Sequence, residues 1–164
     1  YTAWRKLGVL EGRKMAIIGD VLHSRVARSN IIAFNRMGVR VVLSGPPTLM
    51  PKIPEALGAT FTKDPVDAVR DADIVYLLRI QRERQIEGMF PSLDEYHQFF
   101  GVDDRLLGSA SPDALVMHPG PINRRVEIAS EVADGPRSMI LGQVRSGVAL
   151  RMALLFVCLG GVRQ

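Results

Sequence analysis

Residues Met15–Gly38, MAIIGDVLHSRVARSNIIAFNRMG, carry the clearest indication of how this chain folds. Its first four residues are an apolar run typical of a strand, and Gly19 ends that run. Ala27, Ile31 and Phe34 then recur at the spacing of one face of an amphipathic helix. A strand, a polar turn and a helix in this order predict the opening of a βαβ unit. In an open α/β sheet such a turn lies at the carboxyl ends of the strands, where ligands bind.

Basic and hydroxyl side chains crowd the predicted start of this helix. They are His23, Ser24, Arg25, Arg28 and Ser29. Free N–H groups and the positive end of the helix dipole attract anions at such a position, and an arginine can grip a carboxylate or phosphate with two hydrogen bonds. The turn therefore favours an anion site. The alternative is a solvated turn with surface arginines.

The rest of the chain alternates strand-like and helix-like segments. Strand-like runs cover 39–43, 59–62, 73–80 and 114–117. Helical patterns cover 52–57, a segment that begins at Asp64-Pro65, and then 92–99, 103–107, 127–132 and 143–159. Strands and helices that alternate with short turns predict an α/β fold with a doubly wound parallel sheet, Rossmann-like, in three layers α/β/α. The length of 164 residues predicts a single domain with a sizeable core.

Composition excludes several classes of protein. With 47% hydrophobic and 23% charged residues the chain is typical of globular proteins. Its net charge of +4 could indicate nucleic-acid binding, but the basic residues are scattered among acidic ones with few aromatic residues between them. The excess charge favours small anionic ligands over nucleic acid, and the alternative is that it has no functional meaning. The single cysteine, Cys158, excludes an internal disulfide framework, fits a reducing cytoplasm, and is expected to be a packed thiol in an apolar helix.

The two ends of the chain carry further expectations. The most apolar stretch, Val148–Leu159, is shorter than the roughly 20 residues of a membrane helix and contains Arg151, so no membrane span is expected. Tyr1 and Trp4 stand in what looks like the last turns of an amphipathic helix without an N-cap. This uncapped start indicates a piece of a longer protein.

Polar side chains follow three of the predicted strands at the same edge of the sheet. They belong to His23-Ser24-Arg25, to Arg79-Ile80-Gln81 and to His118-Pro119-Gly120-Pro121. An arginine at the end of the apolar run IVYLL is partly desolvated and needs a fixed anionic partner. Two arginines from separate strand ends are what a dicarboxylate or a phosphorylated carboxylate requires. The alternative for Arg79 is an ion pair with Glu83 or Glu127.

The HPGP turn contributes a different chemistry. Two prolines around a glycine make a rigid turn that cannot donate backbone hydrogen bonds at either proline. Its backbone carbonyls suit an amine or amide of a ligand, and the alternative is a tight turn without a ligand. A lone histidine before such a turn, His118, is more often a hydrogen-bonded structural residue than a catalytic one.

Other chemistries lack their signatures. No G-x-G-x-x-G follows the first strand and no P-loop is present, so neither a dinucleotide cofactor nor a nucleoside triphosphate is expected. His23, His97, His118 and Cys158 are too dispersed for a zinc site, and no metal is expected. The serines do not stand in a nucleophile elbow.

Five motifs in this order resemble the aspartate carbamoyltransferase family: GDVLHSRVARSN, LLRIQRER, PSLDEY, VMHPGPINRRVEI and QVRSGVALRMALL. The resemblance covers nearly the whole chain and implies the carboxy-terminal, aspartate-binding half of a two-domain catalytic chain. It implies three parts: 1–12 as the end of an interdomain linking helix, 13–142 as the aspartate-binding domain, and 143–164 as a helix that packs toward the other half. The Ser-Thr-Arg-Thr and His-Pro-Thr-Gln motifs of that other half do not occur here.

The resemblance also implies roles for particular residues. Arg25 and Arg79 resemble the arginines that bind the aspartate carboxylates, and Gln81 resembles the glutamine that orients Arg79 and the substrate amino group. Gly120 and Pro121 resemble the loop whose backbone holds the carbamoyl group of carbamoyl phosphate. The chain departs from some relatives, which have leucine at the position of Gly120 and arginine directly after the second proline, where this chain has isoleucine. The ornithine-binding motifs of the related ornithine enzymes are absent, which favours L-aspartate.

The implied activity is transfer of a carbamoyl group to L-aspartate in pyrimidine biosynthesis. No cofactor is implied, and the implied partners are a homotrimer of the full-length chain and regulatory or dihydroorotase chains. We expect a cytoplasmic enzyme, and we expect the 164-residue chain alone to be inactive. The alternative is a non-catalytic module that binds a small dicarboxylate.

Overall fold

A five-stranded parallel sheet forms the centre of the computed structural model, which describes residues 1–80 and 92–161. The strands are β1 (Lys14–Ile18), β2 (Arg40–Ser44), β3 (Ala59–Phe61), β4 (Ile74–Leu77) and β5 (Leu115–Met117). Their order in the sheet is β3-β2-β1-β4-β5. In the middle of the sheet Ile17 of β1 pairs with Leu43 of β2 on one side and with Tyr76 of β4 on the other.

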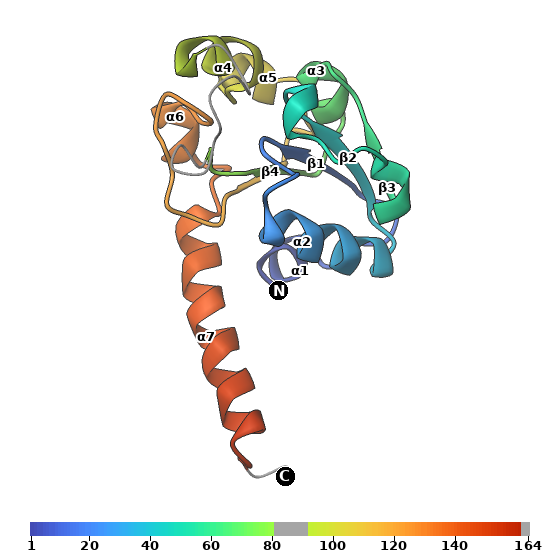
Figure 1. The fold of residues 1–164 in the computed structure, drawn as a ribbon. Helices are drawn as coiled ribbons and strands as arrows, with labels where there is room; N and C mark the ends of the chain where they lie inside the picture. The colour runs from blue at the N-terminus through green and yellow to red at the C-terminus, as the bar shows by residue number, and fades with distance from the viewer. Residues whose placement is uncertain (81–91, 162–164) are drawn as a thin grey trace.

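Helices cover both faces of this sheet. They are α1 (Thr2–Leu7), α2 (Arg25–Arg36), α3 (Pro65–Val69), α4 (Leu93–Phe100), α5 (Asp104–Leu107), α6 (Ser130–Ala133) and α7 (Ile140–Cys158), with short 3-10 helices η1 (Pro47–Leu49) and η2 (Pro54–Leu57). Figure 1 shows α1 and α2 on one side of the strands and α3 and α5 on the other. The three-layer, doubly wound α/β fold predicted from the sequence is therefore confirmed.

Each strand of the centre is buried on both faces, which explains why its sequence reads as a continuous apolar run. Met15 and Ile17 of β1 pack in one core cluster with Ile31 of α2. Ala16 and Ile18 point to the other side and pack in a second cluster with the helices of that layer. All four strand residues are at most 1% exposed, so β1 is the buried axis of the molecule.

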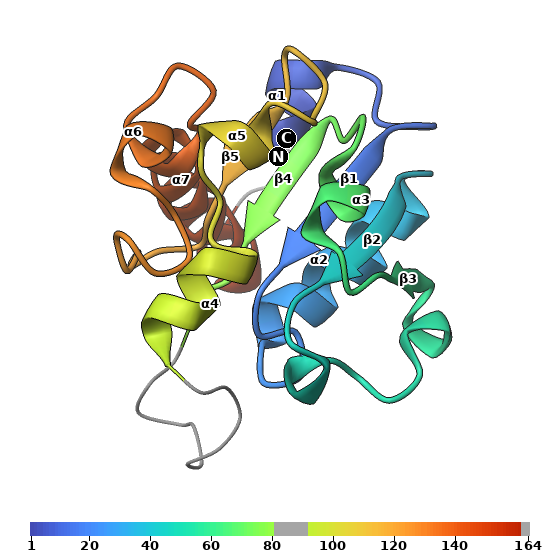
Figure 2. The ribbon, with the colours of Figure 1, turned by 90° about the horizontal axis from the view of Figure 1, so that it is seen from above.

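The direction of winding reverses between β1 and β4. From β1 the chain passes through α2 to β2 and then to β3, on one side of the sheet, and it returns through α3 to β4 on the other side of β1. Figure 2 shows this order of strands from above. Such a reversal leaves a crevice at the carboxyl ends of the two strands, and ligands of open α/β sheets bind there.

Two predicted helices differ from the observed ones. Within the segment 52–57 only Pro54–Leu57 is helical, as the 3-10 helix η2, and Gly58 ends it after one turn in a left-handed conformation. The helix expected over 127–132 begins later, as α6. Glu127 and Ala129 instead pair with Val102: the Val102 N–H donates to the Glu127 carbonyl (3.1 Å) and the Ala129 N–H donates to the Val102 carbonyl (2.9 Å).

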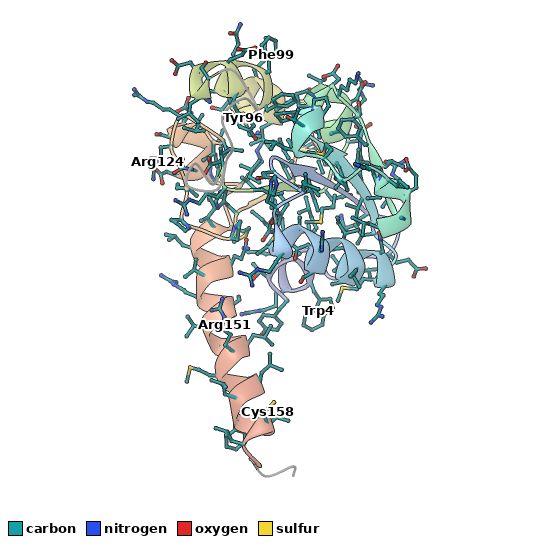
Figure 3. The ribbon with its side chains drawn as sticks, in the orientation of Figure 1. Trp4, Tyr96, Phe99, Arg124, Arg151 and Cys158 are labelled. Carbon is teal, nitrogen blue, oxygen red and sulfur yellow. The ribbon has the colours of Figure 1, made fainter. Side chains whose placement is uncertain are left out.

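The C-terminal helix α7 begins at Ile140, three residues before the predicted start, and projects away from the sheet (Figure 1). Ile140 is its buried residue. By length and composition alone α7 is apolar enough to cross a membrane, although Arg145 and Arg151 lie within it. The expectation of a packed thiol is wrong for this structure, because Cys158 is exposed near the far end of the helix (Figure 3). An apolar sequence indicates that a helix can pack against other elements, but it does not show which element packs there.

Lys14, at the start of β1, gives a prediction for the pH dependence of stability. Its ammonium donates to the carbonyls of Asp67 (3.1 Å) and Arg70 (2.7 Å) at the end of α3. Burial, together with nearby Arg40, lowers the pKa of Lys14 below 10.5. Between the lowered pKa and 10.5 the unfolded chain binds more protons than the folded chain, so the free energy of unfolding should rise with pH in that window.

Urea unfolding of the parent protein and of Lys14→Met at several pH values checks this prediction. We expect the difference in free energy of unfolding, parent minus variant, to increase as the pH rises toward 10.5, because the variant has no ionisable side chain at position 14 and the other titrating groups are common to both proteins. A constant difference across the alkaline range would contradict it.

Candidate functional site

The loop after β1 is held by its own side chains, and it places Arg25 at the start of α2. Asp20 is buried, and its carboxylate accepts a hydrogen bond from the backbone N–H of His23 (3.1 Å) and another from its Nδ1 (2.9 Å). Ser24 caps α2, since its hydroxyl accepts from the Ala27 N–H (3.1 Å). Arg25 is the first residue of the helix and is exposed. The cap thus leaves a cation at the positive end of the helix.

The end of β4 lies directly beside this loop. The Leu78 N–H donates to the Ile18 carbonyl at the end of β1 (2.9 Å), and half-buried Arg79 follows between the buried residues Leu78 and Ile80. A Cβ added at Gly19 would lie 3.0 Å from both the Cβ and the carbonyl oxygen of Leu78. The two strand ends therefore approach each other as closely as a glycine allows.

The HPGP turn follows β5, the next strand of the sheet. Gly120 has a φ of +68°, a conformation that favours glycine, and the peptide bond from Gly120 to Pro121 is cis. Gly120 is half-buried and Pro121 is exposed. This turn therefore presents backbone at the same sheet edge as the loops after β1 and β4.

His118 anchors the turn from below and is fully buried. Its Nδ1 accepts a hydrogen bond from the Gly120 N–H (2.9 Å), and its Nε2 lies 3.2 Å from Oε1 of Glu127. Because a backbone amide can only donate, Nδ1 is unprotonated, and Nε2 carries the proton that it donates to the carboxylate. His118 is therefore hydrogen-bonded at both ring nitrogens, and its assignment as a structural residue stays a prediction.

The backbone of His118 is held as well. Its N–H donates to Oε1 of Gln143 (3.2 Å), and the Gln143 amide donates to the Tyr76 hydroxyl (3.0 Å). Burial raises the pKa of the Tyr76 phenol, so the hydroxyl stays neutral. A chain of hydrogen bonds thus joins α7, β5 and β4 beneath the turn.

The sequence analysis did not identify two residues of the site, Glu127 and Asn123. Glu127 is 1% exposed, and its carboxylate accepts from the Asn123 backbone N–H and from Asn123 Nδ2 (3.2 Å) in addition to His118. The Asn123 amide also donates to the Ile80 carbonyl (3.2 Å). The sequence suggests Glu127 only as an ion-pair partner of Arg79. The signal that could have found it is an acidic residue between the apolar neighbours Val126 and Ile128.

The structure brings the loops that carry most of the predicted site residues to one edge of the sheet. Arg25 follows β1, Arg79 follows β4, and Gly120 with Pro121 follows β5, and these three strands are neighbours. Gln81 lies outside the described residues. Within residues 1–80 and 92–161, no group of three or more His, Cys, Asp and Glu side chains is arranged to hold a metal ion. The edge offers guanidinium groups for carboxylates and backbone carbonyls for an amide.

Comparison with known proteins gives a consistent result. Residues 11–158 match the family model described as aspartate/ornithine carbamoyltransferase, Asp/Orn binding domain. The chain is 54% identical over 161 residues to an aspartate carbamoyltransferase catalytic subunit of Pelotomaculum thermopropionicum, covering 98% of this chain and 52% of the relative. A protein of the same name from Syntrophomonas wolfei is 52% identical over 164 residues, 53% of its length. The chain therefore spans about half the length of the curated relatives that it matches.

Solved structures show the same fold. An ornithine carbamoyltransferase from Pyrococcus furiosus superimposes with a TM-score of 0.81 at 29% identity, over 99% of this chain and 54% of that one. An aspartate transcarbamoylase from Trypanosoma cruzi in complex with N-(phosphonacetyl)-L-aspartic acid superimposes with a TM-score of 0.81 at 27% identity. That match covers 94% of this chain and 52% of the other.

Proposed function

Because the chain belongs to the aspartate/ornithine carbamoyltransferase family, we propose that it is the aspartate-binding half of an aspartate carbamoyltransferase. The complete enzyme would transfer the carbamoyl group of carbamoyl phosphate to L-aspartate. The observation that carries the proposal is the placement of Arg25 and Arg79, whose loops follow the two neighbouring strands at the point where the winding of the sheet reverses.

Each predicted site residue receives a role in this proposal. Arg25 and Arg79 bind the carboxylates of aspartate, and guanidinium groups suit this task because they form paired hydrogen bonds with carboxylates. Gln81 orients Arg79 and the amino group of the substrate. Backbone carbonyls of the turn at Gly120 and Pro121 accept hydrogen bonds from the NH₂ of the carbamoyl group.

The reaction is an acyl transfer. The amine of aspartate attacks the carbamoyl carbon, a C–N bond forms, and a tetrahedral intermediate develops. The bond from that carbon to the phosphate oxygen then breaks, phosphate leaves with the bonding electron pair, and the former amine loses a proton. This half holds aspartate in position, and holding two reactants in the correct geometry lowers the activation barrier substantially. His23 and His118 are both engaged by protein partners, so we assign neither a proton-transfer role.

Aspartate is supported over ornithine by the charges at the sheet edge. Two cations at the ends of β1 and β4 match a dicarboxylate, whereas ornithine carries a cationic side chain. The ligand named for the Trypanosoma cruzi relative, N-(phosphonacetyl)-L-aspartic acid, joins an aspartate to a phosphonate group, which is the combination expected of a ligand that spans both substrate sites.

The exposed parts of α1 and α7 form the proposed junction with the other half of the enzyme. The large apolar residues exposed on α7 are Leu141, Val144, Val148, Leu150, Met152, Leu154, Leu155, Phe156 and Val157. On α1, Trp4 points away from the sheet and is 57% exposed (Figure 3). Apolar patches of this size mark interaction surfaces. We accordingly place 1–12 in the linking helix and 143–164 against the other half, within a cytoplasmic homotrimer to which regulatory or dihydroorotase chains can bind.

The 164-residue chain alone should show no turnover, because the proposed donors to the phosphate and the oxyanion belong to the other half. A colorimetric assay of carbamoyl-aspartate formation, with this chain and with the full-length protein, checks this expectation. We expect product from aspartate, and none from ornithine, with the full-length protein only. Turnover by the short chain would contradict the assignment of those donors to the other half. A full-length protein that binds aspartate without turnover would favour the non-catalytic dicarboxylate-binding module.

A further inference from the structure

We propose that Glu127 is a positioning residue, which acts with His118 and Asn123 to hold the HPGP turn in a fixed relation to the strand end that carries Arg79. These three residues are called the Glu127 cluster below. The inference rests on the proposed function, since it concerns how the two substrate sites of that enzyme are held together. It follows from the hydrogen bonds of a buried carboxylate whose oxygens accept from His118 and Asn123.

The first link runs from Glu127 to the turn. The His118 ring is clamped at both nitrogens, with the Gly120 N–H on Nδ1 and the Glu127 carboxylate on Nε2. Both side chains are at most 1% exposed, so water does not compete for these bonds. The carboxylate therefore orients the ring, and the ring orients the backbone at Gly120, whose neighbouring carbonyls are the proposed acceptors for the carbamoyl group.

The second link runs from Glu127 to the end of β4. Asn123 Nδ2 has two hydrogens, and both of its neighbours are acceptors: the Glu127 Oε2 and the Ile80 carbonyl, each at 3.2 Å. This pair of acceptors sets the orientation of the amide. Ile80 is the residue after Arg79, so the same carboxylate that anchors the turn also anchors the backbone next to the arginine.

The cluster requires a carboxylate and not merely a polar side chain. Three donor groups face the two oxygens of Glu127, namely His118 Nε2–H, the Asn123 N–H and the Asn123 amide. A glutamine at 127 would point its own NH₂ at one of these donors. Rotation of the Asn123 amide would relieve that contact, but the amide oxygen would then face the Ile80 carbonyl. Glu127→Gln must therefore break one of the two links, whichever way the amides turn.

The consequence should appear in kcat more than in KM. In the full-length enzyme, we expect Glu127→Gln to reduce kcat by about 10- to 100-fold, because a misplacement of the reacting groups by a fraction of an ångström is costly. The KM for aspartate should change little, since both arginines remain. Asn123→Ala removes the second link at a less buried residue and should also lower kcat. Because the residues act as a unit, the double variant should be no slower than Glu127→Gln alone.

A matched control is Asp73→Asn, which makes the same carboxylate-to-amide change at the opposite edge of the sheet. Asp73 accepts from Arg13 (2.7 Å) and from the Lys14 N–H (2.9 Å) near the start of β4. This variant should lose stability but keep the parent kcat. Nitrogen-15 NMR of the His118 ring provides a readout independent of turnover, and a neutral ring protonated at Nε2 is expected.

The outcomes separate this inference from the proposed function. If the full-length parent protein does not carbamoylate aspartate, the proposed function fails and the positioning role falls with it. If the parent is active but folded Glu127→Gln and Asn123→Ala keep kcat within about twofold, the function stands and the positioning role is wrong. If Glu127→Gln does not fold, Asn123→Ala alone decides by the same criterion. A His118 ring protonated at Nδ1 would overturn the geometry itself.

Discussion

Replacing Arg79 with alanine should weaken the binding of succinate to the full-length protein by about 100-fold or more. Succinate is a dicarboxylate without the amine of aspartate, so its affinity reports the carboxylate contacts alone. A hydrogen bond to a charged group contributes roughly 1.5–3 kcal/mol, and a factor of ten in affinity corresponds to about 1.4 kcal/mol. Loss of a paired contact from one guanidinium therefore accounts for the expected change, which isothermal calorimetry measures directly.

The control for this substitution is Arg70→Ala. Arg70 lies just before β4, at the opposite edge of the sheet, and pairs with Asp67 on the surface (2.9 Å). The variant makes the same change in net charge, so it separates a local contact from the general field of a basic protein. Its affinity for succinate should stay within about twofold of the parent at physiological ionic strength, where distant charges are screened.

Arg79→Lys refines the interpretation. Lysine keeps the charge but offers a single point of contact, so it should recover only part of the lost affinity if the guanidinium makes a paired contact. An affinity for succinate within about threefold of the parent in Arg79→Ala would mean that this arginine is structural. If the 164-residue chain binds no succinate but the full-length protein does, the site needs the other half to form.

Gly19→Ala should lower the free energy of unfolding by about 2 kcal/mol or more, and it should weaken succinate binding at the same time. Gly19 has a φ of +125°, which side chains rarely adopt, and residues held in such a conformation cost about 1–3 kcal/mol. A Cβ there would also press on Leu78 at 3.0 Å, so the end of β1 must move away from the end of β4. Arg25 and Arg79 follow these two strand ends, so the distance between them should change.

Gly12→Ala serves as a comparison in which a side chain is placed at a positive φ without a close contact. Gly12 has a φ of +79°, and a Cβ at this position would meet nothing within 4 Å. We expect it to cost about 1 kcal/mol and to leave succinate binding unchanged. Urea unfolding gives the free energies and calorimetry gives the affinities. Equal losses of stability in the two variants would show that the close approach at Leu78 adds nothing.

Much of the fold could be predicted from local patterns. The apolar run at Met15–Ile18 and the helical spacing of Ala27, Ile31 and Phe34 correspond to β1 and α2, because hydrophobic periodicity depends only on neighbours in the chain. The position of Arg25 and Arg79 at the same edge of the sheet could also be predicted, because the carboxyl ends of parallel strands all lie on one side. Their roles in binding remain predictions.

The errors and omissions concern features of the structure that are determined by long-range contacts. Residues 127–129 were predicted to begin a helix, but they pair with Val102 instead. Glu127 lies within nine residues of its partners His118 and Asn123, but the Ile80 carbonyl at the end of the second link comes near Asn123 only when β4 and β5 pair. Cys158 was expected in a packed helix, and the structure leaves it exposed.

Local sequence patterns were sufficient to predict the strands, their parallel arrangement and the presence of arginines and an HPGP turn at one edge of the sheet. Those properties follow from periodicity and from the geometry of a right-handed βαβ connection. Only the folded structure shows the close approach of Gly19 to Leu78, the protonated nitrogen of His118, and the link from Glu127 through Asn123 to Ile80. These features depend on atoms that lie far apart along the chain, 43 residues in the case of Asn123 and Ile80, and no local pattern specifies which donor will face which acceptor once the sheet has formed.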